Sequence, residues 1–124
     1  MPNLSIEKES DDSLVNLLGQ LKSDIEFRLN MKFTLFKPIR YRTQTVRGTN
    51  FYVKIKIAGH QLNQLQNENE NDHQDMLANN SNNQPIKFIH VRFWRDLPVN
   101  NFKLTLYDQI LVDKLESDPI DYFE

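Results

Sequence analysis

The sequence predicts an α+β fold in which one N-terminal helix packs against an antiparallel sheet. Two periodicities carry this prediction. Apolar residues recur every three to four positions within residues 10–30, and at every second position in segments after residue 33. One helix followed by four long strands favours a meander of four to five strands wrapped on the helix. The 124 residues suffice for one such domain, and with no cysteine its stability must come from packing alone.

The helix is predicted over residues 10–30. Ser10 is a suitable N-cap, and Asp11 and Asp12 place negative charge at the first turn, where exposed backbone amides favour it. Gly19 lies inside the helix, and we expect it to allow close approach of a neighbouring surface. The apolar stripe, spaced by four, three, four and four residues, consists of Leu14, Leu18, Leu21, Ile25 and Leu29.

The strands are predicted from alternation. Residues 51–57 are apolar at every odd position, which is typical of a strand with one buried and one solvated face. Residues 86–94 repeat the pattern, and further strands are expected at residues 39–45 and 104–112. Pro38 is expected to mark a sheet edge or a bulge.

Residues 60–85 interrupt this order. Eight of these 26 residues are Asn and five are Gln, so the tract cannot bury enough apolar surface to offset its ordering entropy. We therefore expect a single domain over residues 1–124 with a mobile, low-complexity insertion at 60–85.

One stretch between two predicted strands resembles a known family. Gln44 to Gly48 (Gln-Thr-Val-Arg-Gly), followed by Thr-Asn-Phe-Tyr, is similar to the Gln-Val-Val-Ala-Gly-Thr-Asn-Tyr stretch of stefins, the intracellular, type 1 cystatins. Further features agree in order and spacing: Asn-Met-Lys-Phe at 30–33, Asp-Leu-Pro at 96–98 after a strand, and Asp-Tyr-Phe at 121–123. Apart from the insertion, the resemblance covers nearly the whole chain.

The resemblance implies a cystatin/monellin-like fold and a reversible, tight-binding inhibitor of papain-like cysteine proteases, with no catalytic residue and no cofactor. In that family an N-terminal trunk and two hairpin loops form a wedge that enters the active-site cleft. In a meander, alternate turns lie at the same end of the sheet, so both loops should lie together and the insertion at the opposite end. The residues implied to bind the protease are Asn3, Leu4, Gln44, Thr45, Val46, Arg47, Gly48, Leu97 and Pro98.

Two residues depart from the family pattern. Stefins have a glycine in the trunk, where the backbone passes the catalytic cysteine, whereas this chain has Asn3 in a stretch without glycine. This change is compatible with a weaker affinity for the protease and also with a trunk that lies in a shifted position. Arg47 replaces the usual alanine of the first loop, either to pair with a protease carboxylate or to point into solvent.

A basic sheet face supports a competing hypothesis. Residues 28–56 contain eight basic residues and no acidic one. If Ile39, Tyr41, Val53, Ile55, Ile89 and Val91 face the helix, the outer face carries Arg40, Arg42, Tyr52, Lys54, Lys56, His90, Arg92 and Trp94. Such a face could bind an acidic protein surface or nucleic acid, making the chain a subunit of a larger assembly, or it could simply be solvated.

Other functional classes lack a motif. The sequence contains no metal-ligand spacing around its three histidines and no glycine-rich phosphate loop, so we expect a non-enzyme without metal or cofactor. It has no apolar run long enough to span a membrane and its first residues do not resemble a signal peptide, which favours a cytoplasmic protein. A monomer and a dimer that exchanges strands through the first loop both remain open.

Overall fold

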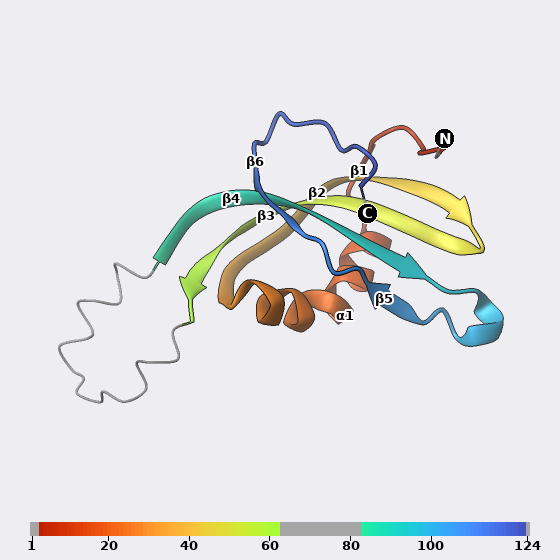
Figure 1. Cartoon of the computed structure of the whole chain (residues 1–124), viewed down its shortest axis with the longest axis horizontal. Coiled ribbons are helices and arrows are strands. Elements are labelled where there is room, and N and C mark those ends of the chain that lie inside the picture. Colours follow the sequence, from red (N-terminus) through yellow and green to blue (C-terminus); the bar gives the residue numbers. More distant parts are fainter. Residues whose placement is uncertain (1–2, 63–82, 124) are drawn as a thin grey trace.

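The computed structural model describes residues 3–62 and 83–123 (Figure 1). The elements, in chain order, are β1 (Lys8–Glu9), α1 (Asp12–Leu29), β2 (Met31–Val46), β3 (Gly48–Gln61), β4 (Asn83–Arg95), the 3-10 turn η3 (Pro98–Asn100), β5 (Leu104–Leu106) and β6 (Leu111–Lys114). The predicted ends of the insertion are wrong, because residues 60–61 continue β3 and residues 83–85 begin β4. Residues 63–82 of the predicted insertion lie outside the described residues.

The N-cap of α1 lies one residue later than predicted. Asp11, not Ser10, is the N-cap, and its carboxylate accepts a hydrogen bond from the Leu14 N–H at 2.9 Å. Ser10 stays outside the helix, and its N–H donates to the Ile39 carbonyl at 3.0 Å. Asn30 ends the helix in the left-handed conformation. The helix therefore starts only where the chain leaves the edge of β2.

The sheet is an antiparallel meander in the order β1-β2-β3-β4-β5, with β6 also paired to β4. It has six strands rather than four or five. The short strand β1 was not predicted, and the expected strand at 104–112 is divided, with β5 and β6 pairing with successive parts of β4. The predicted architecture, one helix against an antiparallel sheet, is confirmed.

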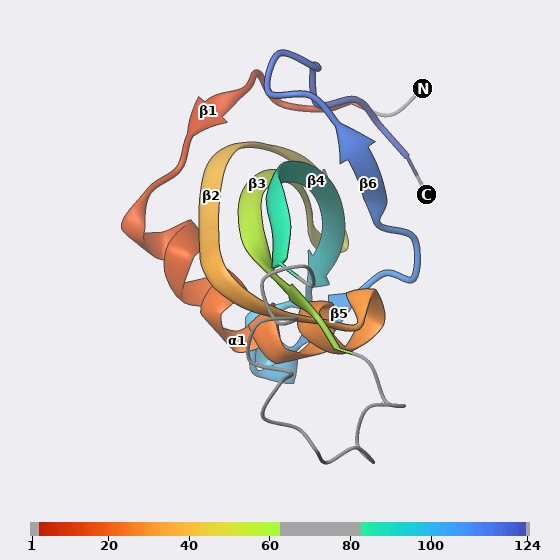
Figure 2. The same ribbon diagram turned by 90° about the vertical axis from the view of Figure 1, so that its left-hand side faces the viewer.

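The sheet curves around α1, as Figures 1 and 2 show. The register of β2 against β3 shifts between Phe33 and Leu35 and again between Pro38 and Arg40. Of the two alternatives expected at Pro38, a sheet edge or a bulge, the second shift favours the bulge. It also explains why Ile39, expected to face the helix, is partly exposed while Pro38 is buried.

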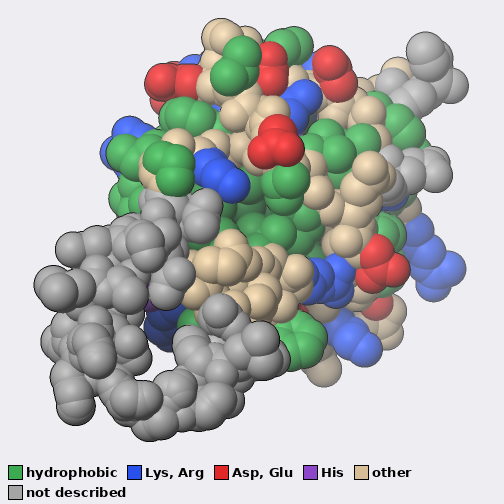
Figure 3. Space-filling model, turned by 60° about the vertical axis from the view of Figure 1, so that its left-hand side comes forward, with side chains coloured by type: hydrophobic (Ala, Val, Ile, Leu, Met, Phe, Trp, Pro, Cys, Tyr) green, Lys and Arg blue, Asp and Glu red, His purple; other side chains and the backbone are tan. Residues whose placement is uncertain are grey.

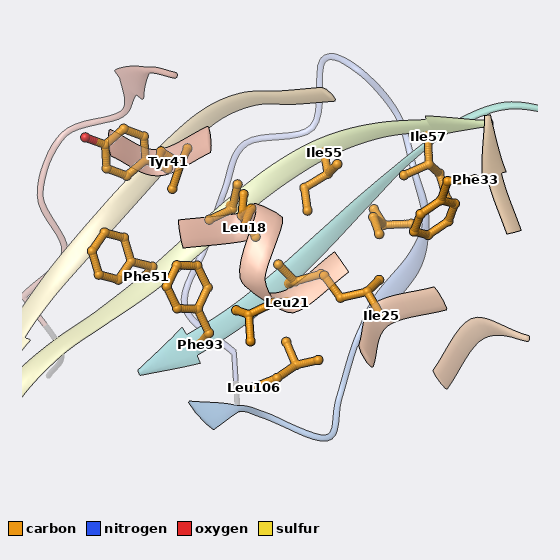
Figure 4. Close-up of a cluster of buried hydrophobic side chains, with 14 of the residues drawn as sticks. Leu18, Leu21, Ile25, Phe33, Tyr41, Phe51, Ile55, Ile57, Phe93 and Leu106 are labelled. Atoms are coloured by element: carbon orange, nitrogen blue, oxygen red, sulfur yellow. The ribbon is translucent and has the colours of Figure 1, made fainter. Parts of the chain in front are cut away.

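The core lies between α1 and the concave face of the sheet (Figure 4). The helix contributes its predicted leucine stripe, with Leu18 and Ile25 fully buried. The strands contribute alternate residues, and the rings of Phe51 and Phe93 stack with centroids 4.7 Å apart. Gly19 is exposed, and a Cβ there would meet nothing within 4 Å, so the expected close approach of another surface is wrong.

Candidate functional site

The first loop, defined as Gln44 to Gly48, is the tip of the β2–β3 hairpin. The register pairs Val46 with Gly48 and leaves Arg47 at the turn. Gly48 has φ +84°, and a Cβ at this position would lie 2.3 Å from the Arg95 carbonyl oxygen. Glycine is therefore required both by the backbone conformation and by the neighbouring strand.

The residues of the first loop differ in exposure. Val46 is 45% exposed and presents apolar surface at the tip, and Thr45 and Arg47 are also exposed. Gln44 is partly buried, and its side-chain oxygen accepts hydrogen bonds from Asn50 Nδ2 at 2.8 Å and Tyr52 Oη at 3.3 Å. The glutamine thus braces the hairpin, and the tip itself is formed by the three residues that follow Thr45.

The second loop, defined as residues 96–103, joins β4 to β5. Asp96 Oδ1 accepts hydrogen bonds from Asn100 Nδ2 at 3.1 Å and from the Leu97 N–H at 2.7 Å. These two donors, in that order of effect, hold the pKa of Asp96 below its ordinary value. Pro98 begins the 3-10 turn, and its carbonyl accepts from the Asn101 N–H. The loop therefore has its own internal hydrogen bonds.

The apolar surface of the second loop is larger than the sequence analysis predicted. Pro98 is exposed and Leu97 is partly buried, but Val99 is 78% exposed and Phe102 is 52% exposed. Neither Val99 nor Phe102 was among the predicted site residues. The signal was present in the sequence, since both are large apolar residues in a short polar stretch that follows a proline.

The two loops lie side by side at one end of the sheet (Figure 1). Thr49, just after the first loop, pairs with Arg95, just before the second. The indole N–H of Trp94 donates to the Arg47 carbonyl at 2.8 Å, so β4 also holds the tip of the first hairpin. We call this end of the sheet the loop edge.

The N-terminal segment, defined as residues 3–7, runs towards the loop edge. The Ser5 N–H donates to the Thr43 carbonyl at 2.7 Å, and the Thr43 N–H donates to Ser5 Oγ at 2.9 Å. Because β1 pairs antiparallel to β2, residues before Ser5 lead in the direction of Val46. Leu4 is partly buried and Asn3 is exposed. The structure thus brings the two loops together, and it holds Ser5 of the N-terminal segment against Thr43, three positions before Val46.

Comparison with known proteins indicates which kind of protein the chain is similar to. No protein-family profile matches the chain. Cystatin-B of Macaca fuscata fuscata is 26% identical over 108 residues, covering 87% of this chain and 83% of that protein. Stefin-C of Bos taurus is 27% identical over 127 aligned residues, covering 98% and 97%. Cystatin-B of Paralichthys olivaceus is 25% identical over 115 residues, covering 93% and 90%. The homologues are stefin-type cystatins.

The helix and antiparallel sheet are accordingly the cystatin fold. The stefin-like stretch recognised in the sequence forms the first loop, and the Asp-Leu-Pro stretch begins the second. The Asp-Tyr-Phe stretch does not reach a loop. It lies across the outer face of the sheet, where Tyr122 and Phe123 each contact the ring of Tyr52 with centroids 5.7 Å apart.

The basic outer face is largely covered by the chain itself. Lys54 is 3% exposed, and its Nζ donates to the Glu116 carbonyl at 2.5 Å. Arg40 pairs with Glu7 at 3.0 Å and with Glu9. The remaining predicted members of this face are Arg42, bonded to backbone carbonyls; Tyr52 and His90, both buried; Lys56, partly buried; Arg92, 3.9 Å from the Tyr107 ring centroid; and Trp94, bonded to the first loop.

A shallow groove of about 380 Å³ lies at the other end of β4, between that strand and β6. Its apolar lining includes Ile86, Phe88, Val112 and Leu115. Figure 3, which turns this end of the molecule forward, shows apolar surface interrupted by charged side chains. Within residues 3–62 and 83–123, no helix has the length and hydropathy to cross a membrane, and no three acidic or histidine side chains are grouped to hold a metal ion.

Proposed function

We propose that this protein is a reversible inhibitor of papain-like cysteine proteases, acting inside cells. The support is the homology to stefin-type cystatins together with the geometry of the loop edge. The proposed contacts are made by Asn3 and Leu4, by Gln44 to Gly48, and by Leu97 and Pro98. Val99 and Phe102 extend the same apolar edge.

One observation carries the proposal. Two loops far apart in the sequence lie together at one end of the sheet, joined by the Thr49–Arg95 pair, and the N-terminal segment is bonded to β2 at Thr43, three positions before Val46. Each loop tip presents exposed apolar surface, which is the feature that a concave cleft can bury. Since the loops are held by hydrogen bonds before binding, little conformational entropy is lost on association.

The departures from the stefin pattern affect the strength of binding more than its mode. Asn3 is exposed and adds a side chain where stefins have glycine, which favours a weaker contact of the N-terminal segment. Arg47 is exposed at the turn, and within the described residues no ion pair involves it. Its guanidinium is available to a carboxylate on the protease.

The competing function, docking of an acidic surface or nucleic acid on the basic outer face, has less support. Arg40 and Arg42 are already bonded to the N-terminal segment, and Lys54 is covered by residues near the C-terminus. A partner that needs these cations would first have to displace the chain's own segments.

An inhibition titration of papain tests the proposal. We expect inhibition at nanomolar to micromolar concentrations and a loss of at least about tenfold for Val46→Asp, because the variant places a carboxylate where apolar surface would be buried. Val15→Asp is the matched control, since Val15 is 50% exposed and lies on α1 rather than on either loop. No inhibition by a folded protein at high micromolar concentration would contradict the proposal.

A further inference from the structure

The C-terminal segment, defined as residues 115–123, is tied to the outer face of the sheet by its backbone. The carbonyls of Glu116, Ile120 and Phe123 accept hydrogen bonds from Lys54 at 2.5 Å, Arg42 at 2.7 Å and Arg92 at 3.4 Å. The Ile120 side chain is fully buried. This segment is therefore part of the folded structure rather than a loose tail.

The same segment contacts the N-terminal segment. Figures 1 and 2 show the two running side by side over the sheet. The Ile120 N–H donates to Glu7 Oε2 at 3.1 Å, while Glu7 Oε1 accepts from Arg40 Nε at 3.0 Å. Burial of Glu7 opposes ionisation, but the Ile120 N–H and Arg40 outweigh it and lower the pKa of Glu7.

Arg42 links the two segments through one guanidinium. Its Nε donates to the Ser5 carbonyl at 2.8 Å, and its Nη1 donates to the Ile120 carbonyl at 2.7 Å. Charge-assisted hydrogen bonds from a planar guanidinium fix direction as well as distance. Ser5 is held from the other side by Thr43, so its position is determined by β2, by Arg42 and, through Arg42, by Ile120.

We infer that Arg42 is a positioning residue for protease binding: together with the C-terminal segment it fixes Ser5, and thereby aims Asn3 and Leu4 at the loop edge. This inference rests on the proposed function. Arg42 lies on β2, paired with Tyr52, four positions before Val46 at the loop tip. Its effect on affinity would therefore pass through the N-terminal segment and not through a contact of its own with the protease.

A double-mutant cycle tests this route. Arg42→Met removes the guanidinium and keeps an aliphatic stem, and it is combined with deletion of residues 1–4. In the full chain we expect papain inhibition to weaken about tenfold, mainly through faster dissociation, and in the shortened chain the same substitution should change inhibition less than about twofold. An equal loss in both chains would overturn the inference.

Arg28→Met is the matched control. Arg28 also donates to backbone carbonyls, those of Tyr107 at 2.8 Å and Leu106 at 3.3 Å, and it pairs with Asp108 at 3.3 Å; none of these partners within the described structure belongs to the N-terminal segment. We expect its effect on inhibition to be equal in the full and shortened chains. In Arg42→Lys the ammonium group can reach only one of the two carbonyls well, so this variant should inhibit papain more strongly than Arg42→Met but less strongly than the original chain. If Arg42→Met does not fold, Arg42→Lys takes its place in the double-mutant cycle.

Amide hydrogen exchange separates this inference from the proposed function. In the free protein, Arg42→Met should speed exchange at the Ser5 N–H, while Arg28→Met should leave it unchanged. Unchanged Ser5 exchange in both variants would refute the positioning role. If the unmodified chain does not inhibit papain, the proposed function fails, and the exchange result alone decides whether Arg42 holds the N-terminal segment.

Discussion

The indole nitrogen of Trp94 lies 2.8 Å from the carbonyl oxygen of Arg47, so a side chain of β4 holds the turn between β2 and β3. The two residues are 47 positions apart in the sequence. A Cβ on Gly48 would come within 2.8 Å of the same indole nitrogen. The tip of the first loop is thus fixed from outside its own hairpin.

Replacing Trp94 with Phe should weaken inhibition without unfolding the protein. The variant keeps an aromatic ring but removes the donor to Arg47, which leaves the loop tip freer before binding. We expect papain inhibition to weaken roughly threefold to tenfold and stability to fall by no more than about 1.5 kcal/mol. Inhibition titrations and urea denaturation measure the two effects. Unchanged inhibition would mean that the hydrogen bond does not contribute to loop order.

Gly48→Ala should destabilise the protein, whereas Gly19→Ala should stabilise it. At Gly48 the φ of +84° opposes a side chain, and so does the Arg95 carbonyl oxygen, which would lie 2.3 Å from the alanine Cβ; we expect a loss of about 1–3 kcal/mol. At Gly19, inside α1 with open space around it, alanine should add about 0.5–1 kcal/mol through helix propensity. Urea denaturation of both variants checks the pair. If the two substitutions changed the free energy of unfolding equally and in the same direction, the structural distinction drawn between the two glycines would be wrong.

Stability should fall as the pH drops from about 6.5 towards 4, because of His90. Its side chain is 1% exposed, and within the described structure its Nε2 has no hydrogen-bond partner. Burial, followed by the charges of Lys114 and Lys54, lowers the pKa of His90 to about 4, against the opposing effect of Asp118 and Glu7. Between the two pKa values the unfolded chain binds more protons than the folded one, so protonation favours unfolding.

The expected loss over this range is on the order of 2 kcal/mol, measured by urea denaturation at successive pH values. Glu7 and Asp118 have pKa values lowered from 4.5 and 3.8, so their stabilising effect begins to decline only near pH 4.5, at the lower end of that range. His90→Gln, which does not titrate, is the control and should flatten the dependence between pH 6.5 and 5. A slope that persists in this variant would assign the effect to other groups.

Replacing residues 63–82 with a short glycine–serine linker should leave papain inhibition within about threefold of the original. His60 pairs with Asn83, so the two ends to be joined are neighbours on adjacent strands. They lie at the end of β3 opposite Gly48 and the loop edge. A large loss of inhibition would show that residues 63–82 contribute to binding, contrary to the proposed function.

The elements could be predicted because their periodicities are local. The leucine stripe of α1 and the alternation in β3 each decide which face is buried, and the core follows from them. Ser10 fits a cap by local pattern, since it precedes two aspartates. The pairing of its N–H with Ile39, which excludes it from the helix, depends on β2 lying alongside, and the sequence does not contain that information.

The arrangement at the loop edge was predictable only in part. The alternation of turns in a meander placed both loops at one end, but the bond between Trp94 and Arg47 depends on strand register. The basic outer face followed correctly from alternation, yet its accessibility did not. Lys54 is buried by residue 116, which lies 62 positions later in a stretch without regular apolar spacing. No local sequence pattern predicts that the C-terminal segment covers the outer face of the sheet.

The pairing of His60 with Asn83 brings the end of β3 and the start of β4 together, at the end of the sheet opposite the loop edge. Because the two strand ends are neighbours, we expect the connection between them to tolerate changes of length and composition. We therefore expect that a fluorescent protein, an affinity tag or a tether to a surface can be inserted between these strands while the loop edge stays accessible.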